Sequence, residues 1–211
     1  MRQRRKTRFF HHLQENIKVY LFVFIFFTAG IIAGSLSVYW LAAEQVEELN
    51  QVFFSFVDYL SGQKPLNQML ILKQSLLQNG LFLLLLWLCG NLFFGFIFVL
   101  GAMFYRGFTI GFTVGFLAQQ NGLAGVMFAA AAVLPQNLLF VPAAVVAAAF
   151  AFSFSWLLFC RRFGGRQNFA YGESLLQYTF VLVLAGVFFV AGSLVETMVA
   201  PVFMRLTVSL L

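Results

Sequence analysis

The sequence predicts an all-α integral membrane protein: a polytopic helical bundle with five transmembrane helices and an interrupted region in the third and fourth spans. Composition is the first observation behind this prediction. Of 211 residues, 62% are hydrophobic and only 9% are charged, whereas about 25% of the residues in a soluble domain carry a charge. Long charge-free intervals are the second observation. Lipid is therefore expected to surround most of the chain.

Four charge-free intervals are long enough to cross a bilayer, whose hydrocarbon core of about 30 Å takes about 20 helical residues. They cover residues 19–43, 74–105, 107–160 and 174–195. The third interval holds 54 residues, and a straight helix of that length would extend roughly 80 Å. It is therefore expected to turn back and to supply two spans. The five predicted spans are 19–41, 76–105, 107–128, 138–160 and 174–196.

Basic residues predict the orientation, because Lys and Arg near span ends are retained in the cytoplasm. With the N-terminus cytoplasmic and the C-terminus extracytoplasmic, ten basic residues lie inside and three outside. Arg106 is then expected in a short inner loop between the second and third spans. The predicted organisation is a basic cytoplasmic N-terminus at 1–18 and a single membrane domain at 19–211. The first apolar run exceeds the h-region of a secretory signal, so it is expected to stay in the protein.

An outer segment at 44–74 follows the first span. Its first part repeats apolar residues at helical spacing, among them Val46, Leu49 and Phe53, between acidic positions. This pattern predicts an amphipathic helix that ends before Pro65. Two roles stay open: packing in the interfacial zone of the membrane, or docking to a partner.

Glycine recurs every four residues at the start of the third span, at Gly107, Gly111 and Gly115. These residues form one bare ridge on a helix, and such ridges let helices in lipid pack closely. The neighbour is expected to be either the first span, through Gly30 and Gly34, or the fourth, through its alanines at 143, 147 and 151. Packing within the chain and contact with another subunit are both open.

Polar and helix-breaking residues follow the ridge: Gln119 to Gly122, then Pro135, Gln136 and Asn137, then Pro142. Amides in hydrocarbon are costly unless they are paired. The region is therefore expected to form the outer turn between the third and fourth spans, or else to line a small polar site as interrupted helices do in transporters. Glu196 is expected at the outer end of the fifth span, within reach of water.

Catalytic chemistry is not expected. The chain has no phosphate-binding glycine loop, and His11 and His12 are adjacent, so they cannot share a metal from one helix face. Cys89 and Cys160 lie far apart within apolar stretches. The sequence therefore predicts no catalytic residues, no cofactor, no metal, no nucleic-acid partner and no small-molecule substrate, with membrane lipid as the surrounding partner.

The region at 107–142 resembles the stage II sporulation protein M family. The residues that carry the resemblance are the Gly111–Leu117 run, Gly122, Gly125, Pro135 to Leu139 and Pro142, with Val195, Glu196 and Pro201 in the tail. The length, the basic start and the five-span plan also fit that family.

The resemblance implies a multi-pass protein of the bacterial cell membrane, located in the mother-cell membrane at the sporulation septum. It implies a scaffold that anchors two peptidoglycan-degrading partners, stage II sporulation proteins D and P, during engulfment of the forespore. The expected packing or partner-interface residues are Gly107, Gly111, Gly115, Pro135, Gln136, Asn137, Pro142 and Glu196. The alternative is a transport or permease-like membrane subunit with a polar site at residues 119–142.

Overall fold

The computed structural model describes residues 17–61, 67–164 and 171–208, and every element within these ranges is helical. This confirms the all-α prediction, while most of the basic segment at 1–18 lies outside the described residues. The elements are α2 (Ile17–Ser37), η1 (Val38–Trp40), α3 (Ala43–Ser61), α4 (Gln68–Gly90), α5 (Gly95–Gly164), α6 (Tyr171–Met198) and α7 (Ala200–Val208).

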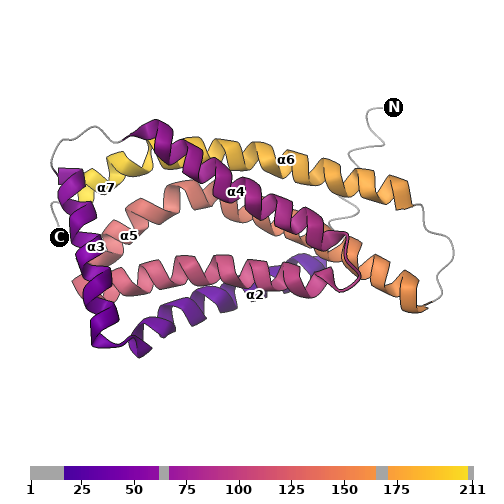
Figure 1. Cartoon of the computed structure of the whole chain (residues 1–211), viewed down its shortest axis with the longest axis horizontal. Helices are drawn as coiled ribbons and strands as arrows, with labels where there is room; N and C mark the ends of the chain where they lie inside the picture. The colour runs from indigo at the N-terminus through magenta and orange to yellow at the C-terminus, as the bar shows by residue number, and fades with distance from the viewer. Residues whose placement is uncertain (1–16, 62–66, 165–170, 209–211) are drawn as a thin grey trace.

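Four helical stretches of the described chain are long and apolar enough to cross a membrane: Ile17–Trp40, Gln68–Gly90, Gly95–Phe163 and Tyr171–Thr207. They run along the long axis of the molecule (Figure 1). Many of their large apolar side chains are exposed, including Phe24, Leu81 and Phe180. Such exposure suits helices whose outer faces contact lipid.

The helix α5 folds back on itself at Gly122. This residue has φ 55° and ψ −132°, a left-handed conformation that interrupts the helix and that suits glycine because it has no Cβ. Figure 1 shows one arm, residues 95–121, running along the bundle and the other, residues 123–164, returning. A methyl group at Gly125 would overlap the Leu117 carbonyl, so the two arms meet closely at this turn.

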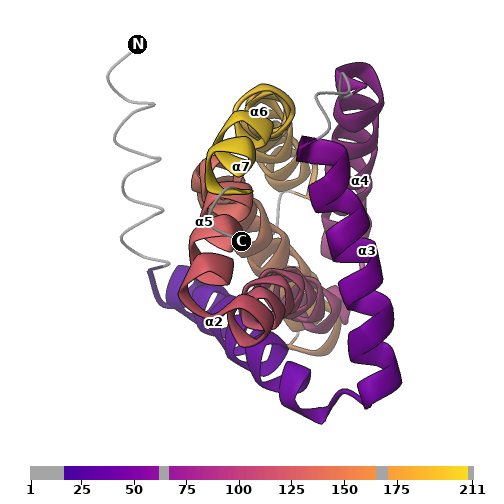
Figure 2. The ribbon, with the colours of Figure 1, turned by 90° about the vertical axis from the view of Figure 1, so that its left-hand side faces the viewer.

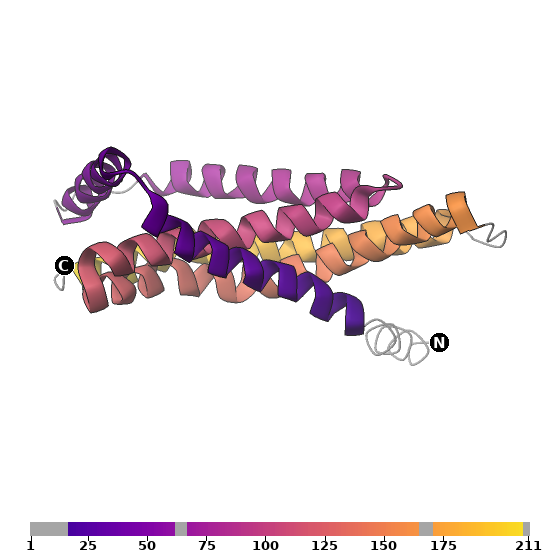
Figure 3. The same ribbon diagram turned by 90° about the horizontal axis from the view of Figure 1, so that it is seen from below.

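The first arm of α5 packs on α2 through glycine on both sides. A methyl group at Gly107 or Gly111 would overlap the backbone of Phe27 or Ile31, and one at Gly115 would lie 2.8 Å from Ser35 Cα. Gly30 and Gly34 of α2 face the α5 backbone in the same way. Figure 3 shows α2 crossing this arm obliquely. The ridge therefore lies against the first span and not against the alanines of the second arm.

The turn between α4 and α5 is anchored by a serine of the second arm. Ser155 Oγ accepts a hydrogen bond from Phe96 N at 2.8 Å and donates one to the Leu92 carbonyl at 2.6 Å. Nearby, Tyr178 of α6 donates to the Leu86 carbonyl at 2.6 Å. These bonds join α4, α5 and α6 at the end of the molecule where α4 meets α5.

The predicted position of Arg106 in an inner loop is wrong. α4 ends at Gly90, a turn covers Asn91 to Phe94, and Arg106 lies near the middle of the first arm of α5. The predicted spans 76–105 and 107–128 therefore have the wrong boundaries. The charge does not mark a loop because it is held inside the bundle by polar and aromatic side chains from other helices.

The predicted outer turn near Pro135, Gln136 and Asn137 is also wrong, because these residues lie inside the second arm of α5. The side-chain amides of Gln136 and Asn137 donate to the carbonyls of Ala132 and Val133, one helical turn earlier. The two prolines, Pro135 and Pro142, are accommodated within this arm, which is curved (Figure 1), as proline within a helix commonly causes. The reversal occurs at Gly122 instead.

Candidate functional site

Polar side chains from three helices meet inside the bundle. We call Ser75 and Asn79 of α4, Arg106 of α5, and Ser193 and Glu196 of α6 the polar cluster. Ser75, Asn79 and Ser193 are buried, and Arg106 and Glu196 are partly buried. Ser75 and Asn79 are four residues apart on α4, so both face the same neighbours. Polar side chains at membrane depth are costly, and they commonly mark a functional site.

Hydrogen bonds join α4 to α6 within the polar cluster. Ser75 Oγ lies 2.8 Å from Ser193 Oγ and also donates to Glu196 Oε2. Asn79 Nδ2 donates to the Ser75 carbonyl at 2.9 Å and to Ser75 Oγ at 3.2 Å. Glu196 is therefore held on the α4 side by a neutral hydroxyl donor.

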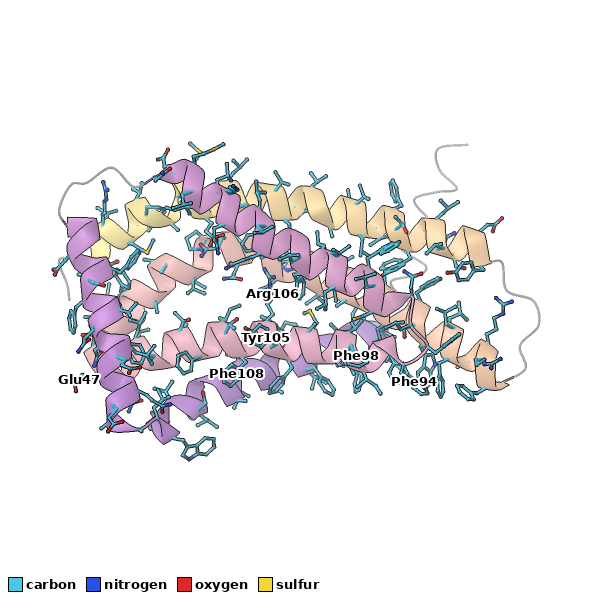
Figure 4. All side chains as sticks on the ribbon, viewed as in Figure 1. Glu47, Phe94, Phe98, Tyr105, Arg106 and Phe108 are labelled. Atoms are coloured by element: carbon cyan, nitrogen blue, oxygen red, sulfur yellow. The ribbon has the colours of Figure 1, made fainter. Side chains whose placement is uncertain are left out.

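Arg106 is held mainly by neutral groups. Its Nη2 donates to Asn79 Oδ1 at 3.0 Å. Its guanidinium carbon lies 4.7 to 5.3 Å from the ring centroids of Phe82, Phe140 and Phe189, which attract a cation through their π faces. The buried Nε makes no hydrogen bond within the described chain. Figure 4 shows Arg106 directed toward α4 from the first arm of α5.

A partly open cavity of about 530 Å³ adjoins the polar cluster. Its polar lining includes Asn79, Arg106 and Glu196 from the cluster, together with Gln136 and Asn137 from the second arm of α5. Gln136 Oε1 is buried and has no hydrogen-bond partner in the described chain. The cavity thus presents a cation, an acid and several amides between membrane helices.

The predicted site residues lie in four places. Gln136, Asn137 and Glu196 line this cavity, and Gly107, Gly111 and Gly115 face α2. Pro142 lines a separate apolar groove between α5 and α6, while Pro135 lies within the second arm of α5.

Sequence reasoning missed Ser75, Asn79, Arg106 and Ser193. The available signal was the Ser75 and Asn79 spacing of four within an apolar run, which places two polar groups on one helix face.

A second feature is α3, which lies across one end of the bundle (Figures 1 and 2). Its apolar residues Val46, Leu49 and Phe53 pack on a small core that includes Phe116 and Phe128. The rings of Phe53 and Phe128 meet edge to face, 5.6 Å apart. The helix extends from Ala43 to Ser61, which confirms the predicted amphipathic helix.

The opposite face of α3 is exposed and acidic. Glu47, Gln51, Phe54 and Asp58 follow one another at helical spacing, and all four are exposed. Figure 4 shows Glu47 pointing away from the bundle. The helix contains four acidic residues and no basic one. This face therefore offers negative charge beside an exposed aromatic ring.

The described residues contain no group of three or more His, Cys, Asp or Glu side chains that could hold a metal ion. Cys89 and Cys160 are free thiols. The polar cavity and the acidic face of α3 each present polar groups with which a binding partner could interact.

Comparison with known proteins assigns the family. A search of curated proteins and a search of solved structures each found no significant match. The family model for stage II sporulation protein M matches residues 23–201, which cover the membrane-length helices except the first turns of α2 and most of α7. The chain is a helical, sporulation-associated membrane protein that belongs to the stage II sporulation protein M family.

Proposed function

We propose that this protein is a membrane scaffold of endospore formation that anchors peptidoglycan-degrading partners at the septum during engulfment of the forespore. The partners proposed are stage II sporulation proteins D and P. The observation that supports this role is the arrangement of α3, which is fixed to the bundle by one face and exposes the other. A rigid, exposed helix at the end of a membrane bundle is suited to docking a second protein.

The scaffold role requires α3 to lie outside the mother-cell membrane, where peptidoglycan is found. We propose that α2, α4, each arm of α5, and α6 cross the membrane, which gives five crossings with the N-terminus cytoplasmic. α3, the Gly122 turn and α7 then share the outer side, because they lie at the same end of the bundle (Figure 1). Arg161 and Arg162 lie at the opposite end of α5, as the retention of basic residues in the cytoplasm favours.

Charge reversal on α3 tests the docking role. Replacing Glu47→Lys and Glu48→Lys together changes two exposed acids and leaves the packed face of α3 intact. We expect fluorescent fusions of the two partners to lose their septal enrichment in sporulating cells, because complementary charge guides association. The matched control is Glu173→Lys, which reverses an exposed acid in the first turn of α6, at the other end of the bundle.

If the partner fusions remain enriched at the septum in the α3 variant, and the variant reaches the membrane at its normal level, the docking role is contradicted. Loss of the protein itself would instead indicate a folding defect. In that case, the exposed pair Val52→Ser and Phe54→Ser provides a second test of the same face without changing charge.

A transport-like role is the second candidate, and one observation favours it: Gln136 and Asn137 line a cavity that also contains Arg106 and Glu196. Solute flux in reconstituted vesicles that is abolished by Gln136→Leu with Asn137→Leu would support it. Absence of flux, together with recovery of the two partners on the tagged protein, would support the scaffold.

A further inference from the structure

We propose that the cavity beside the polar cluster binds a small zwitterion, a molecule that carries a phosphate or carboxylate group close to an ammonium group. This inference goes beyond the docking role. It concerns the cavity inside the bundle and not the exposed face of α3. It requires no passage of the ligand across the membrane. It also departs from the sequence-based expectation that the protein has no small-molecule ligand.

The anionic half of the ligand is indicated by the unused donors of Arg106. A guanidinium group has five N–H donors and remains charged in proteins. Arg106 uses Nη2 for Asn79, while its buried Nε has no partner in the described chain. The three surrounding phenylalanine rings attract the charge but supply no oxygen acceptor. Phosphate and carboxylate oxygens match the planar donor array of arginine.

The cationic half is indicated by acceptors on two residues that line the same cavity. Gln136 Oε1 is buried and accepts no hydrogen bond from the described residues. The Glu196 carboxylate is bonded by the Ser75 hydroxyl, which leaves it further capacity to accept. Both residues line the cavity together with Arg106. An ammonium group would donate to these oxygens and would place a positive charge beside Glu196.

Net charge favours a ligand that is neutral overall. Arg106 and Glu196 contribute opposite unit charges to the cavity, so their sum is zero. A simple anion or a simple cation would leave one uncompensated charge among membrane helices, which is costly in a region of low dielectric constant. A zwitterion satisfies each charged residue and leaves the whole site neutral.

The size and walls of the cavity agree with this ligand. Its volume of about 530 Å³ lies within the range of roughly 300 to 1,000 Å³ typical of small-ligand sites. Apolar side chains, including Leu81 and Ile110, form part of the lining. The same zwitterionic chemistry is offered by the head group of phosphatidylethanolamine and by free phosphoethanolamine, so the experiment must separate the lipid from the soluble compound.

Native mass spectrometry of the purified full chain provides the test. The protein is delipidated in detergent and is then offered phosphatidylethanolamine or phosphatidylglycerol with identical acyl chains. We expect retention of the zwitterionic lipid to exceed that of the anionic lipid about tenfold, the effect of one charge-assisted hydrogen bond. O-phosphoethanolamine, added to the lipid-free protein, tests the soluble source through a shift in thermal unfolding. Binding by the lipid alone identifies a lipid site, and binding by the soluble compound shows that the head group suffices.

Three variants connect the preference to the cavity. Glu196→Gln leaves a side chain able to accept from Ser75 but makes the site positive, so the lipid preference should reverse toward phosphatidylglycerol. Arg106→Gln should abolish retention of both lipids. Lys73→Gln is the matched control, because Lys73 is exposed on α4 two residues before Ser75 and does not line the cavity; its preference should equal that of the unmodified protein.

A reversed lipid preference in Glu196→Gln distinguishes ligand binding from a structural role. A change that only loosened the bundle would reduce the retention of both lipids alike. The proposal is overturned if the unmodified protein binds neither lipid nor phosphoethanolamine, or if it retains both lipids equally. It is also overturned if the unmodified protein prefers one lipid but Glu196→Gln leaves that preference unchanged. This second test still applies if the Arg106→Gln variant does not fold.

Discussion

Single glycine residues decide how closely α2 and the first arm of α5 can approach. Gly111→Ala would place a methyl group against the Ile31 backbone. Because backbone cannot move aside as a side chain can, the two helices must separate. We expect a loss of about 1 to 3 kcal/mol in unfolding free energy, as in other overpacked sites, measured as a lower thermal midpoint of the purified protein in detergent.

The control for Gly111 lies on the same arm. A methyl group at Gly101 meets no atom within 4 Å, so Gly101→Ala should be neutral or should stabilise by up to about 1 kcal/mol through helix propensity. Equal thermal midpoints for the two variants would contradict the close packing of α2 on α5.

Ser155 offers a second test at the residue scale. Ser155→Ala removes the acceptor for Phe96 N and the donor for the Leu92 carbonyl, both in or beside the turn before α5. Each lost hydrogen bond costs about 0.5 to 1.5 kcal/mol, so the thermal midpoint should fall. Ser153→Ala on the same helix is the control and should have a smaller effect. An equal decrease in the thermal midpoint of Ser153→Ala would contradict a specific role for the Ser155 hydrogen bonds.

At the scale of elements, the reversal of α5 depends on the backbone of Gly122. No atom lies within 4 Å of a methyl group built there, so Gly122→Ala tests the dihedral angles alone. We expect a loss of about 1 to 3 kcal/mol, the typical cost of a strained residue, in the same thermal measurement. Gly80→Ala is matched to it, since the space around Gly80 is equally open but its backbone is helical. A Gly122 variant as stable as the Gly80 variant would exclude the strained turn.

Some elements followed directly from the sequence and others did not. The amphipathic α3 was predictable because its apolar spacing is local. The boundary between α4 and α5 does not follow from the charge pattern, because Arg106 lies within a helix, whereas Gly90 and Asn91 mark the helix end. Proline lacks a backbone donor and so predicts a turn at Pro135, yet a helix in a bundle accommodates it, and Gly122 supplies the left-handed residue.

The polar cluster, too, was only partly predictable from the sequence. The sequence marks the amides of Gln136 and Asn137 as unusual for membrane depth and places Glu196 at the outer end of a span. That they share one cavity with Arg106 depends on which helix faces pack together, and residue spacing within one helix carries no such information.

At the scale of the whole molecule, the proposed orientation predicts which ends of the helices contact the cell exterior. Cys89 and Cys160 are first replaced by alanine, and one cysteine is then placed at Leu123 or at Leu92, both exposed positions at opposite ends of the bundle. A membrane-impermeant thiol reagent applied to intact cells should label Leu123→Cys and not Leu92→Cys. Lysis should make both reactive, which is the control for access.

Labelling of Leu92→Cys in intact cells would reverse the orientation and would place α3 in the cytoplasm. The proposed scaffold role would then fail, because peptidoglycan lies outside the membrane. The zwitterion site would be unaffected, since its chemistry is internal to the bundle.

The polar cluster also imposes an order on biogenesis. During translation Asn79 is made first, Arg106 follows with an amide already available to it, and Glu196 is made only when most of the chain has left the ribosome. A nascent polypeptide that stops before α6 would hold the partly buried Arg106 without the one acid of the polar cluster, Glu196. We expect such truncated products to be degraded by membrane quality-control proteases, so that synthesis of α6 serves as the checkpoint for a finished molecule.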